Sequence, residues 1–164
     1  MKQTNTAFLS QAAMIAAIYV VLTYVFAPFS FGEIQVRIAE ALTILPVFTP
    51  ADIPGLFIGC LIGNIIGGAI LPDIIFGSIA TLLGAFFTYQ LCRSRQLLAP
   101  LPPILANTLI VPFVLRFGYG VALPIPFMML TVGIGEILSC GVLGLVLYFA
   151  LRKYKNIVFL PIRN

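Results

Sequence analysis

Apolar residues form long runs along the chain, and proline, glycine and charged residues separate these runs at short intervals. A helix needs about 20 apolar residues to cross the hydrocarbon core of a bilayer, which is about 30 Å thick. By this measure the candidate membrane helices are Ala7–Ala27, Ile34–Phe48, Ile53–Ile70, Asp73–Cys92, Leu101–Leu115 and Leu123–Leu151. The pattern therefore predicts an all-α fold, an integral membrane bundle of six transmembrane helices.

The second and fifth of these runs are too short to cross a bilayer upright in full. Each also contains a proline, Pro46 in the second run and Pro112 in the fifth. Short or proline-interrupted spans often mark the binding region of a transporter. These two runs are therefore where a binding region is most expected.

The composition supports a membrane location. Hydrophobic residues make up 61% of the chain and charged residues 9%, and the mean hydropathy is +1.13. A soluble domain has about 45–50% apolar and about 25% charged residues. Because apolar runs use almost the whole length, we expect residues 1–164 to form a single domain. The net charge of +4 would suggest a nucleic-acid partner in a soluble protein, but here the basic residues lie mostly at the ends of spans.

The basic residues also predict the orientation in the membrane. Loops rich in Lys and Arg stay on the cytoplasmic side, and six spans place both termini on one side. That side carries Lys2, Arg93, Arg95, Arg152, Lys153, Lys155 and Arg163, whereas the other carries Arg37 and Arg116. We therefore expect both termini to be cytoplasmic.

The densest group of charges opens the second run. Glu33, Arg37 and Glu40 are spaced four and three residues apart, so on a helix they share one face. Charges in apolar surroundings are costly and are commonly functional. Two interpretations remain open: the strip holds a polar ligand, or it is a neutralised ion pair between helices.

Other polar residues lie inside the apolar runs. Glu136 is the clearest, because a lone carboxylate in the middle of a span must be paired, protonated or in a wet cavity. It either contacts a ligand or an ion, or forms a structural ion pair with an arginine. The further candidates are Asn64, Asn107 and Arg116. Asp52 and Asp73 lie at helix starts, where a carboxylate is first of all a cap.

Small residues predict where helices approach closely. Gly55, Gly59, Gly63 and Gly67 are spaced by four, which favours tight helix contact inside the bundle over a ligand-lining role. In the first run, Ala12–Ala16 and Ala13–Ala17 have the same spacing. This alanine patch either docks another protein or packs internally.

Several chemistries have no support in the sequence. The chain has no histidine, which excludes histidine metal sites and a histidine base. Cys60, Cys92 and Cys140 lack the spacing of a metal or redox motif, and no Walker A motif is present. We expect no cofactor and no metal, and a transport subunit rather than an enzyme.

Four stretches together match a known family. They are Val36–Pro46 (with Arg-Ile-Ala-Glu-Ala-Leu), Ile53–Asn64 (with Pro-Gly-Leu-Phe-Ile-Gly-Cys), Asp73–Leu83 and Gly133–Cys140 (Gly-Ile-Gly-Glu-Ile-Leu-Ser-Cys). The chain resembles the queuosine-precursor transporter (QueT) family, whose members are S components, the substrate-binding subunits of energy-coupling factor (ECF) transporters. The resemblance implies a six-helix S-component fold in a bacterial cell membrane. It also implies a transmembrane T subunit and two cytosolic ATPases as partners.

The resemblance further implies a 7-deazaguanine precursor of queuosine as the substrate. A carboxylate can accept hydrogen bonds from the adjacent N–H and amino groups of such a base, and Glu33, Glu40 and Glu136 are the candidates. Arg37 or Gln35 would meet the carbonyl oxygen, and Phe31, Phe117 or Tyr119 would stack on the ring. The alanine patch of the first run, Ala12, Ala13, Ala16 and Ala17, matches the pattern by which S components dock the T subunit.

Two other classes of function compete with this interpretation. Glu40 and Glu136 could exchange protons in a self-sufficient, proton-coupled carrier of a small polar solute. A membrane enzyme or a structural scaffold is the third class, but no catalytic constellation supports it.

Overall fold

The computed structural model describes residues 5–30, 36–91, 95–155 and 159. Its elements, in chain order, are α1 (Asn5–Val25), α2 (Ala27–Ser30), η1 (Ile38–Val47), α3 (Asp52–Ile66), α4 (Leu71–Leu91), η2 (Gln96–Leu98), α5 (Leu101–Phe117), α6 (Ile125–Glu136), η3 (Ile137–Leu143) and α7 (Gly144–Arg152). Every one of these elements is helical, which confirms the predicted all-α fold. The candidates Phe31, Glu33 and Gln35 lie outside the described residues.

Four apolar helical segments are long enough to cross a membrane. They are Thr6–Val25, Leu71–Leu91, Gln96–Phe117 and Ile125–Arg152. Two shorter apolar helices, Ile38–Val47 and Asp52–Ile66, complete the six expected runs within the described part of the chain. The protein is therefore a multi-pass membrane protein in which two of the six segments fall short of a full crossing.

The second segment differs from the expected α-helix. Residues Ile38–Val47 form a 3₁₀ helix, which rises about 2 Å per residue and so spans about 20 Å. Every residue from Ala39 to Val47 is buried. Because η1 contacts α1, α3, α4, η3 and α7, it forms the centre of the bundle.

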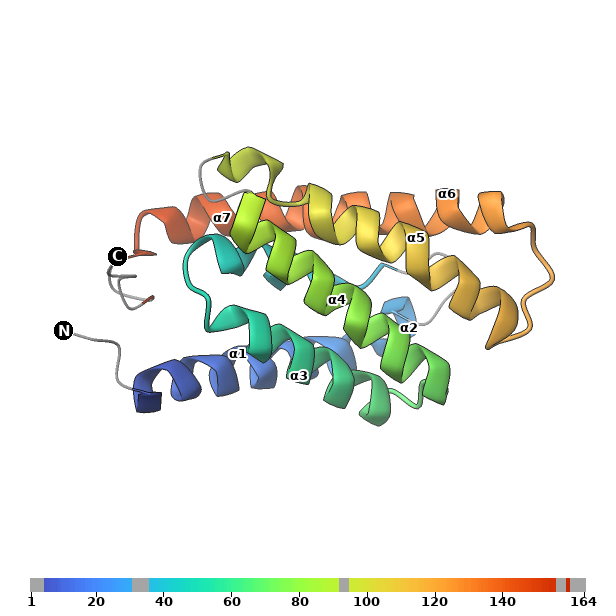
Figure 1. Ribbon diagram of the computed structural model, residues 1–164, viewed down its shortest axis with the longest axis horizontal. Helices are drawn as coiled ribbons and strands as arrows, with labels where there is room; N and C mark the ends of the chain where they lie inside the picture. The colour runs from blue at the N-terminus through green and yellow to red at the C-terminus, as the bar shows by residue number, and fades with distance from the viewer. Residues whose placement is uncertain (1–4, 31–35, 92–94, 156–158, 160–164) are drawn as a thin grey trace.

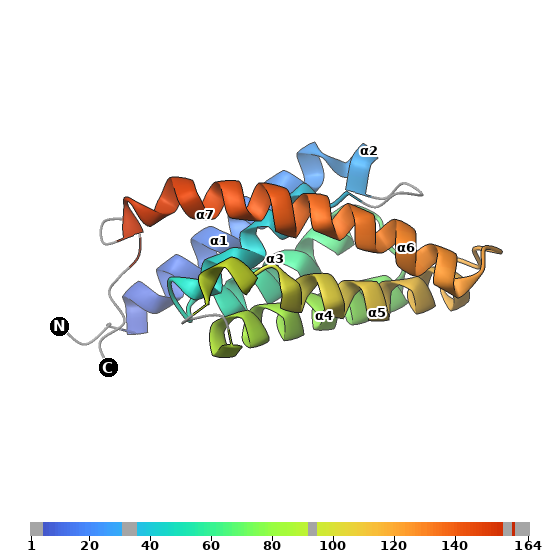
Figure 2. The same ribbon diagram turned by 90° about the horizontal axis from the view of Figure 1, so that it is seen from above.

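The longer helices surround η1 in an order that follows the chain. Figure 1 shows α1 beside α3, α4 crossing next to α3, and α5 between α4 and α6, and the same neighbours are in contact. The turned view in Figure 2 shows the continuous α6–η3–α7 segment along one side of the bundle. The start of α1 and the end of α7 lie at the same end of the molecule (Figure 1), as an even number of crossings requires.

The glycine ladder of α3 packs against α1, as the spacing predicts. A Cβ atom on Gly55 would lie 2.6 Å from the carbonyl oxygen of Ala12, and one on Gly59 would lie 2.7 Å from Cβ of Tyr19. These distances leave no room for a side chain. The ladder is therefore a structural contact between two helices.

The same contact divides the alanine patch of α1. Ala12 and Ala16 are buried and lie against Gly55 and Gly59 of α3. In contrast, Ala13 and Ala17 are exposed. Of the four alanines, only Ala13 and Ala17 are therefore accessible on the surface of the described bundle.

The last span contains a local change of helix type. The segment from Ile125 to Arg152 is α-helical except for a π-helical part, Ile137–Leu143, which begins directly after Glu136. Stretches of π-helix are rare and occur frequently at functional sites. The π-helical segment therefore marks Glu136, which precedes it, and Cys140, which lies inside it, as candidate functional residues.

Candidate functional site

Polar side chains from six segments of the chain meet in the interior of the bundle. The 3₁₀ geometry of η1 places residues three apart on one face, and Arg37, Glu40 and Thr43 have this spacing and are all buried. The other buried polar members come from α1, α3, α4, α5 and the last span, and are Tyr19, Asn64, Asp73, Thr81, Asn107, Glu136 and Cys140. We call these residues together the interior polar cluster.

Glu40 lies at the centre of the interior polar cluster, and only one of its two carboxylate oxygens accepts hydrogen bonds. It is 1% exposed. Its Oε1 atom accepts hydrogen bonds from the Tyr19 hydroxyl at 2.5 Å and from the Thr81 hydroxyl at 2.9 Å. Its Oε2 atom is buried without a hydrogen-bond partner. Because buried polar atoms are almost always paired, Oε2 is an open acceptor.

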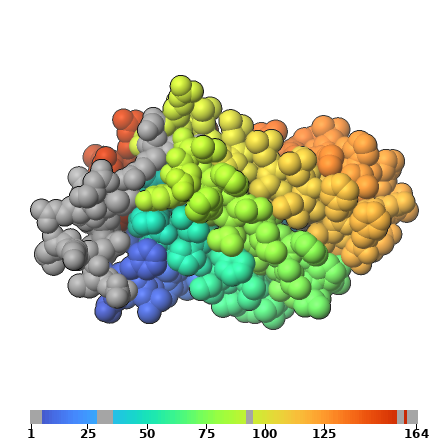
Figure 3. Space-filling model, in the orientation of Figure 1, coloured from blue at the N-terminus to red at the C-terminus, as the bar shows by residue number. Residues whose placement is uncertain are grey.

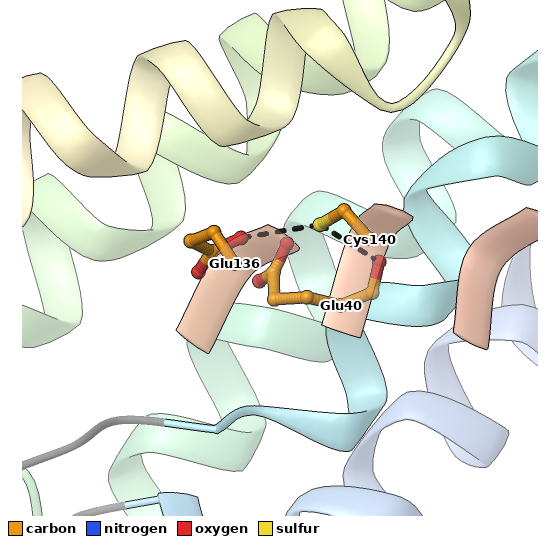
Figure 4. Close-up of side chains that lie close together, drawn as sticks. All are labelled: Glu40, Glu136 and Cys140. Atoms are coloured by element: carbon orange, nitrogen blue, oxygen red, sulfur yellow. Dashed lines mark hydrogen bonds between the residues drawn. The ribbon is translucent and has the colours of Figure 1, made fainter. Parts of the chain in front are cut away.

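Glu136 and Cys140 face Glu40 from the π-helical region (Figure 4). The Cys140 thiol lies 3.1 Å from Oε2 of Glu136 and 3.4 Å from the backbone oxygen of Glu40. The Cys140 sulfur and one carboxylate oxygen of each glutamate all lie within 4.8 Å of one another. Two carboxylates this close cannot both stay charged unless a proton, a cation or hydrogen-bond donors lie between them.

Asn107 adds a donor to this side of the interior polar cluster. Asn107 is buried on α5, and its side chain lies next to the Glu136 carboxylate. Its amide nitrogen Nδ2 has no hydrogen-bond partner. The interior polar cluster therefore contains an unpaired acceptor on Glu40 and an unpaired donor on Asn107.

Arg37 forms an ion pair with Asp73 of α4, and not with Glu40, its neighbour in the sequence. Nη2 of Arg37 lies 3.2 Å and 3.3 Å from the two oxygens of Asp73. The Tyr119 hydroxyl donates to Asp73 at 3.0 Å, and the Asn64 amide donates to its backbone oxygen at 3.4 Å. Asp73 is therefore a partner of Arg37, and the interpretation of Asp73 as a simple helix cap is wrong.

Tyr119 reaches the interior polar cluster from the loop between α5 and α6. Burial, together with the adjacent Asp73 carboxylate, raises the pKa of the Tyr119 phenol above its ordinary value. The hydroxyl is therefore protonated at neutral pH and acts as the donor in this hydrogen bond. The loop is thereby joined to the start of α4.

Gly77 makes room for the ion pair. A Cβ atom at this position would lie 3.0 Å from Oδ1 of Asp73, 3.3 Å from Nδ2 of Asn64 and 3.6 Å from Nη1 of Arg37. The three polar groups converge over this glycine because it has no side chain. Gly77 is thus a structural requirement of the site that the sequence pattern does not reveal as such.

The structure brings together most of the candidate residues that it describes. Arg37, Glu40, Asn64, Asn107 and Glu136 are all buried in the interior polar cluster. The structure adds Tyr19, Asp73, Thr81 and Cys140. Of these additions, Asp73 is visible in the sequence as a carboxylate at a helix start, and Cys140 lies four residues after Glu136.

Three other candidates lie elsewhere. Arg116 is exposed, and its Nη1 donates to the backbone oxygen of Val121 at 3.0 Å. This hydrogen bond joins the end of α5 to the loop that follows it. Phe117 is 77% exposed and stacks on Phe113. Asp52 is fully buried and both of its carboxylate oxygens lack a partner, so the interpretation of Asp52 as a helix cap is also wrong.

Comparisons with known proteins place the chain in a family but give no second structure. No solved structure matches the chain. The chain is 34% identical over 85 residues to the "Queuosine precursor transporter QueT" of Lactococcus lactis subsp. cremoris (strain MG1363), a match that covers 51% of this chain and 50% of that protein. The chain thus spans about half the length of this curated relative.

A family model described as QueT transporter matches residues 9–153. The matched range includes every residue of the interior polar cluster, from Tyr19 on α1 to Cys140 in the last span. Because the model covers most of the chain and the whole helical bundle, this protein belongs to the QueT transporter family.

Proposed function

We propose that this protein binds a queuosine precursor, a 7-deazaguanine base, within the interior polar cluster. We further propose that it serves as the S component of an ATP-driven ECF importer in a bacterial plasma membrane. Membership of the QueT transporter family supports the transport role, and the name of the similar L. lactis protein supports the class of substrate. The observation that carries the proposal is the buried, unpaired Oε2 of Glu40 in a group of side chains where the Glu136 carboxylate lies within 4.8 Å.

The chemistry of a guanine-like base matches these open groups. Its ring N–H and its exocyclic amine lie side by side, and carboxylates accept from such a pair strongly. In the proposed complex Glu40 and Glu136 accept these hydrogen bonds, and the Asn107 amide donates to the carbonyl oxygen of the base. Leaving a buried polar group unpaired costs about 1–3 kcal/mol, so a ligand that pairs all three groups gains affinity from each.

The charge of the site also favours this class of ligand. Glu40 and Glu136 place two acidic side chains within 4.8 Å, and ligand N–H groups between them would relieve their repulsion. A cationic aminomethyl substituent would do so more strongly than a neutral nitrile. The carboxylates and the thiol are also groups that a metal ion can take, but the Asn107 donor has no role in metal binding and suits an organic ligand.

The direction of entry follows from the ion pair. Asp73 lies in the first turn of α4, and Tyr119 lies in the loop between α5 and α6. Both positions are at the end of the bundle opposite the start of α1 and the end of α7 (Figure 1). If the termini are cytoplasmic, as the basic residues predict, a substrate enters past the Arg37–Asp73 pair from outside the cell.

A calorimetric titration tests the substrate. We expect the purified protein to bind the nitrile base, the aminomethyl base or queuine, and to bind adenine at least about tenfold more weakly, because adenine lacks the N–H and amine edge. A tenfold difference corresponds to about 1.4 kcal/mol, which is within the range of one charge-assisted hydrogen bond. Equal binding of adenine, or no binding of any 7-deazaguanine base, would exclude the proposal.

The exposed face of α1 is the proposed contact with the T subunit. Ala13 and Ala17 are exposed and four residues apart, so a partner helix can approach closely there. We expect A13L/A17L to abolish co-purification with the T subunit and the ATPases while leaving ligand binding unchanged. Ala150→Leu on α7, which enlarges another exposed alanine, is the matched control and should retain the partners.

The second candidate function is a self-sufficient, proton-coupled transporter. The proximity of Glu40 and Glu136 favours it, because one proton shared by two buried carboxylates is easily gained or lost. Uptake by the purified chain alone in liposomes, driven by a pH gradient, would support this function. Uptake that requires ATP and partner subunits would exclude it.

A further inference from the structure

An apolar groove of about 690 Å³ follows the outer surface where α4 and α5 meet. Phe87 and Leu91 of α4 and Leu101, Leu105 and Leu109 of α5 contribute to its lining, and all of them are exposed. Both helices lie on the face of the molecule that Figure 3 shows, α4 in green and α5 in yellow. The groove therefore faces the lipid rather than the interior polar cluster.

Two arginines mark one end of this groove. Arg95 belongs to its lining, and a second hollow of about 530 Å³ that Arg95 also lines contains Arg152. Both arginines are exposed, and neither forms an ion pair with a residue in the described ranges. Gln96 in the second hollow accepts a hydrogen bond from Tyr148 of α7, which connects the two hollows to the end of the last span.

The length of the groove matches one leaflet of a bilayer. From Leu101 to Leu109 the lining advances eight residues along α5, which is about 12 Å at the rise of an α-helix. Half of a hydrocarbon core is about 15 Å. An acyl chain whose headgroup lies at the Arg95 end of the groove would therefore extend over most of one leaflet.

A neighbouring groove provides an internal comparison. It has a volume of about 460 Å³ and continues along the same two helices toward their other end, where it shares Leu109 and Ile110 with the first. Its lining contains no charged residue. Positive charge is thus found at only one of the two grooves, at the end that carries α7.

We propose that the groove between α4 and α5 binds an anionic phospholipid. One acyl chain lies along α5, and the phosphate lies between Arg95 and Arg152. Anionic lipids are enriched in the cytoplasmic leaflet, and each basic residue near the membrane surface contributes about fivefold to their binding. This proposal does not depend on the identity of the transported substrate.

Native mass spectrometry of the full-length protein tests the charge requirement. The protein in detergent is incubated with equal amounts of phosphatidylglycerol and phosphatidylcholine that have identical acyl chains. We expect wild type to retain phosphatidylglycerol preferentially, and R95Q/R152Q to lower its affinity about 25-fold, which is about fivefold for each arginine. The matched control is K153Q/K155Q, which removes two exposed charges from the same end. Because these lysines line neither hollow, the loss of preference should be clearly smaller than for R95Q/R152Q.

A second variant tests the groove itself without a change of charge. Ala106 belongs to the lining, and Ala106→Phe should fill the space and lower retention of phosphatidylglycerol. The proposal is overturned if both lipids are retained equally, if K153Q/K155Q loses as much affinity as R95Q/R152Q, or if Ala106→Phe has no effect. It is also overturned if a protein partner covers the groove in the purified complex and excludes lipid.

Discussion

Replacing Glu40 with glutamine should change ligand binding and protein stability in opposite directions. The two oxygens of Glu40 have different roles: Oε1 accepts from Tyr19 and Thr81, and Oε2 has no partner. A glutamine retains an oxygen for Tyr19 and Thr81 but places an NH₂ group at the open position. That group donates where the proposed ligand also donates, so the ligand loses its acceptor.

The expected magnitudes follow from the geometry. A hydrogen bond to a charged group contributes about 1.5–3 kcal/mol, so affinity for the 7-deazaguanine base should fall about 10- to 150-fold. In the unliganded protein, keeping both carboxylates charged within 4.8 Å would cost about 3 kcal/mol at an effective dielectric constant of about 20, so either this repulsion or the uptake of a proton that avoids it destabilises the fold. Removal of the charge on Glu40 relieves this repulsion and should raise the free energy of unfolding by up to that amount.

Calorimetry and thermal unfolding in detergent measure the two quantities separately. Thr81→Val is the matched control, because it removes a partner of Oε1 and leaves Oε2 free. It should lower the unfolding temperature and affect affinity less than the glutamine variant does. If Glu40→Gln binds the base as tightly as wild type does, Oε2 is not the ligand acceptor and the assignment of the site is wrong.

Three further predictions concern the structure around the site. Gly59→Ala should lower the free energy of unfolding by about 1–3 kcal/mol, because the added Cβ would lie 2.7 Å from Cβ of Tyr19. Gly133→Ala is the control, because the nearest atom to its added Cβ is 3.5 Å away, and it should be close to neutral in the same thermal denaturation. Equal losses of stability in the two variants would contradict the account. Asp73→Asn should destabilise the protein by about 3–5 kcal/mol because it removes the carboxylate charge that forms a buried ion pair with Arg37. An unchanged unfolding temperature would show that this ion pair does not contribute to stability. Treatment with a chelator should leave ligand affinity in calorimetry unchanged, and a loss that zinc or another divalent ion restores would instead assign a metal to the site.

The sequence predicts the centre of the site better than its boundaries. Glu40 and Glu136 are identifiable because a carboxylate inside an apolar run is costly and therefore informative. Arg37 is identifiable for the same reason, but its partner is not. Asp73 lies 36 residues away and at a helix start, where the local pattern favours a cap, so only the tertiary arrangement reveals the ion pair.

Helix type is a further limit on sequence analysis. A spacing of three or four places Arg37 and Glu40 on one face of either an α-helix or a 3₁₀ helix, and the apolar pattern of η1 does not distinguish the two. The π-helical segment after Glu136 has no recognised sequence signal either. Tyr19 and Thr81 also escape notice, because a single hydroxyl in an apolar span has many ordinary structural roles.

The alanine patch shows how one spacing can serve two purposes. Ala12–Ala16 and Ala13–Ala17 are equivalent in sequence, but the α3 glycines cover only the first pair. Which pair is exposed depends on the rotation of α1 about its axis, and α3 determines that rotation. The sequence predicts that α1 has close contacts, and the structure assigns them to faces.

A structure of the protein with a bound 7-deazaguanine base tests the central claim most directly. The account predicts the base between Glu40, Glu136 and Asn107, with its N–H and amine edge within hydrogen-bond distance of the carboxylates. A base bound instead at the exposed loop beside Arg116, with the interior polar cluster unchanged, would contradict the account.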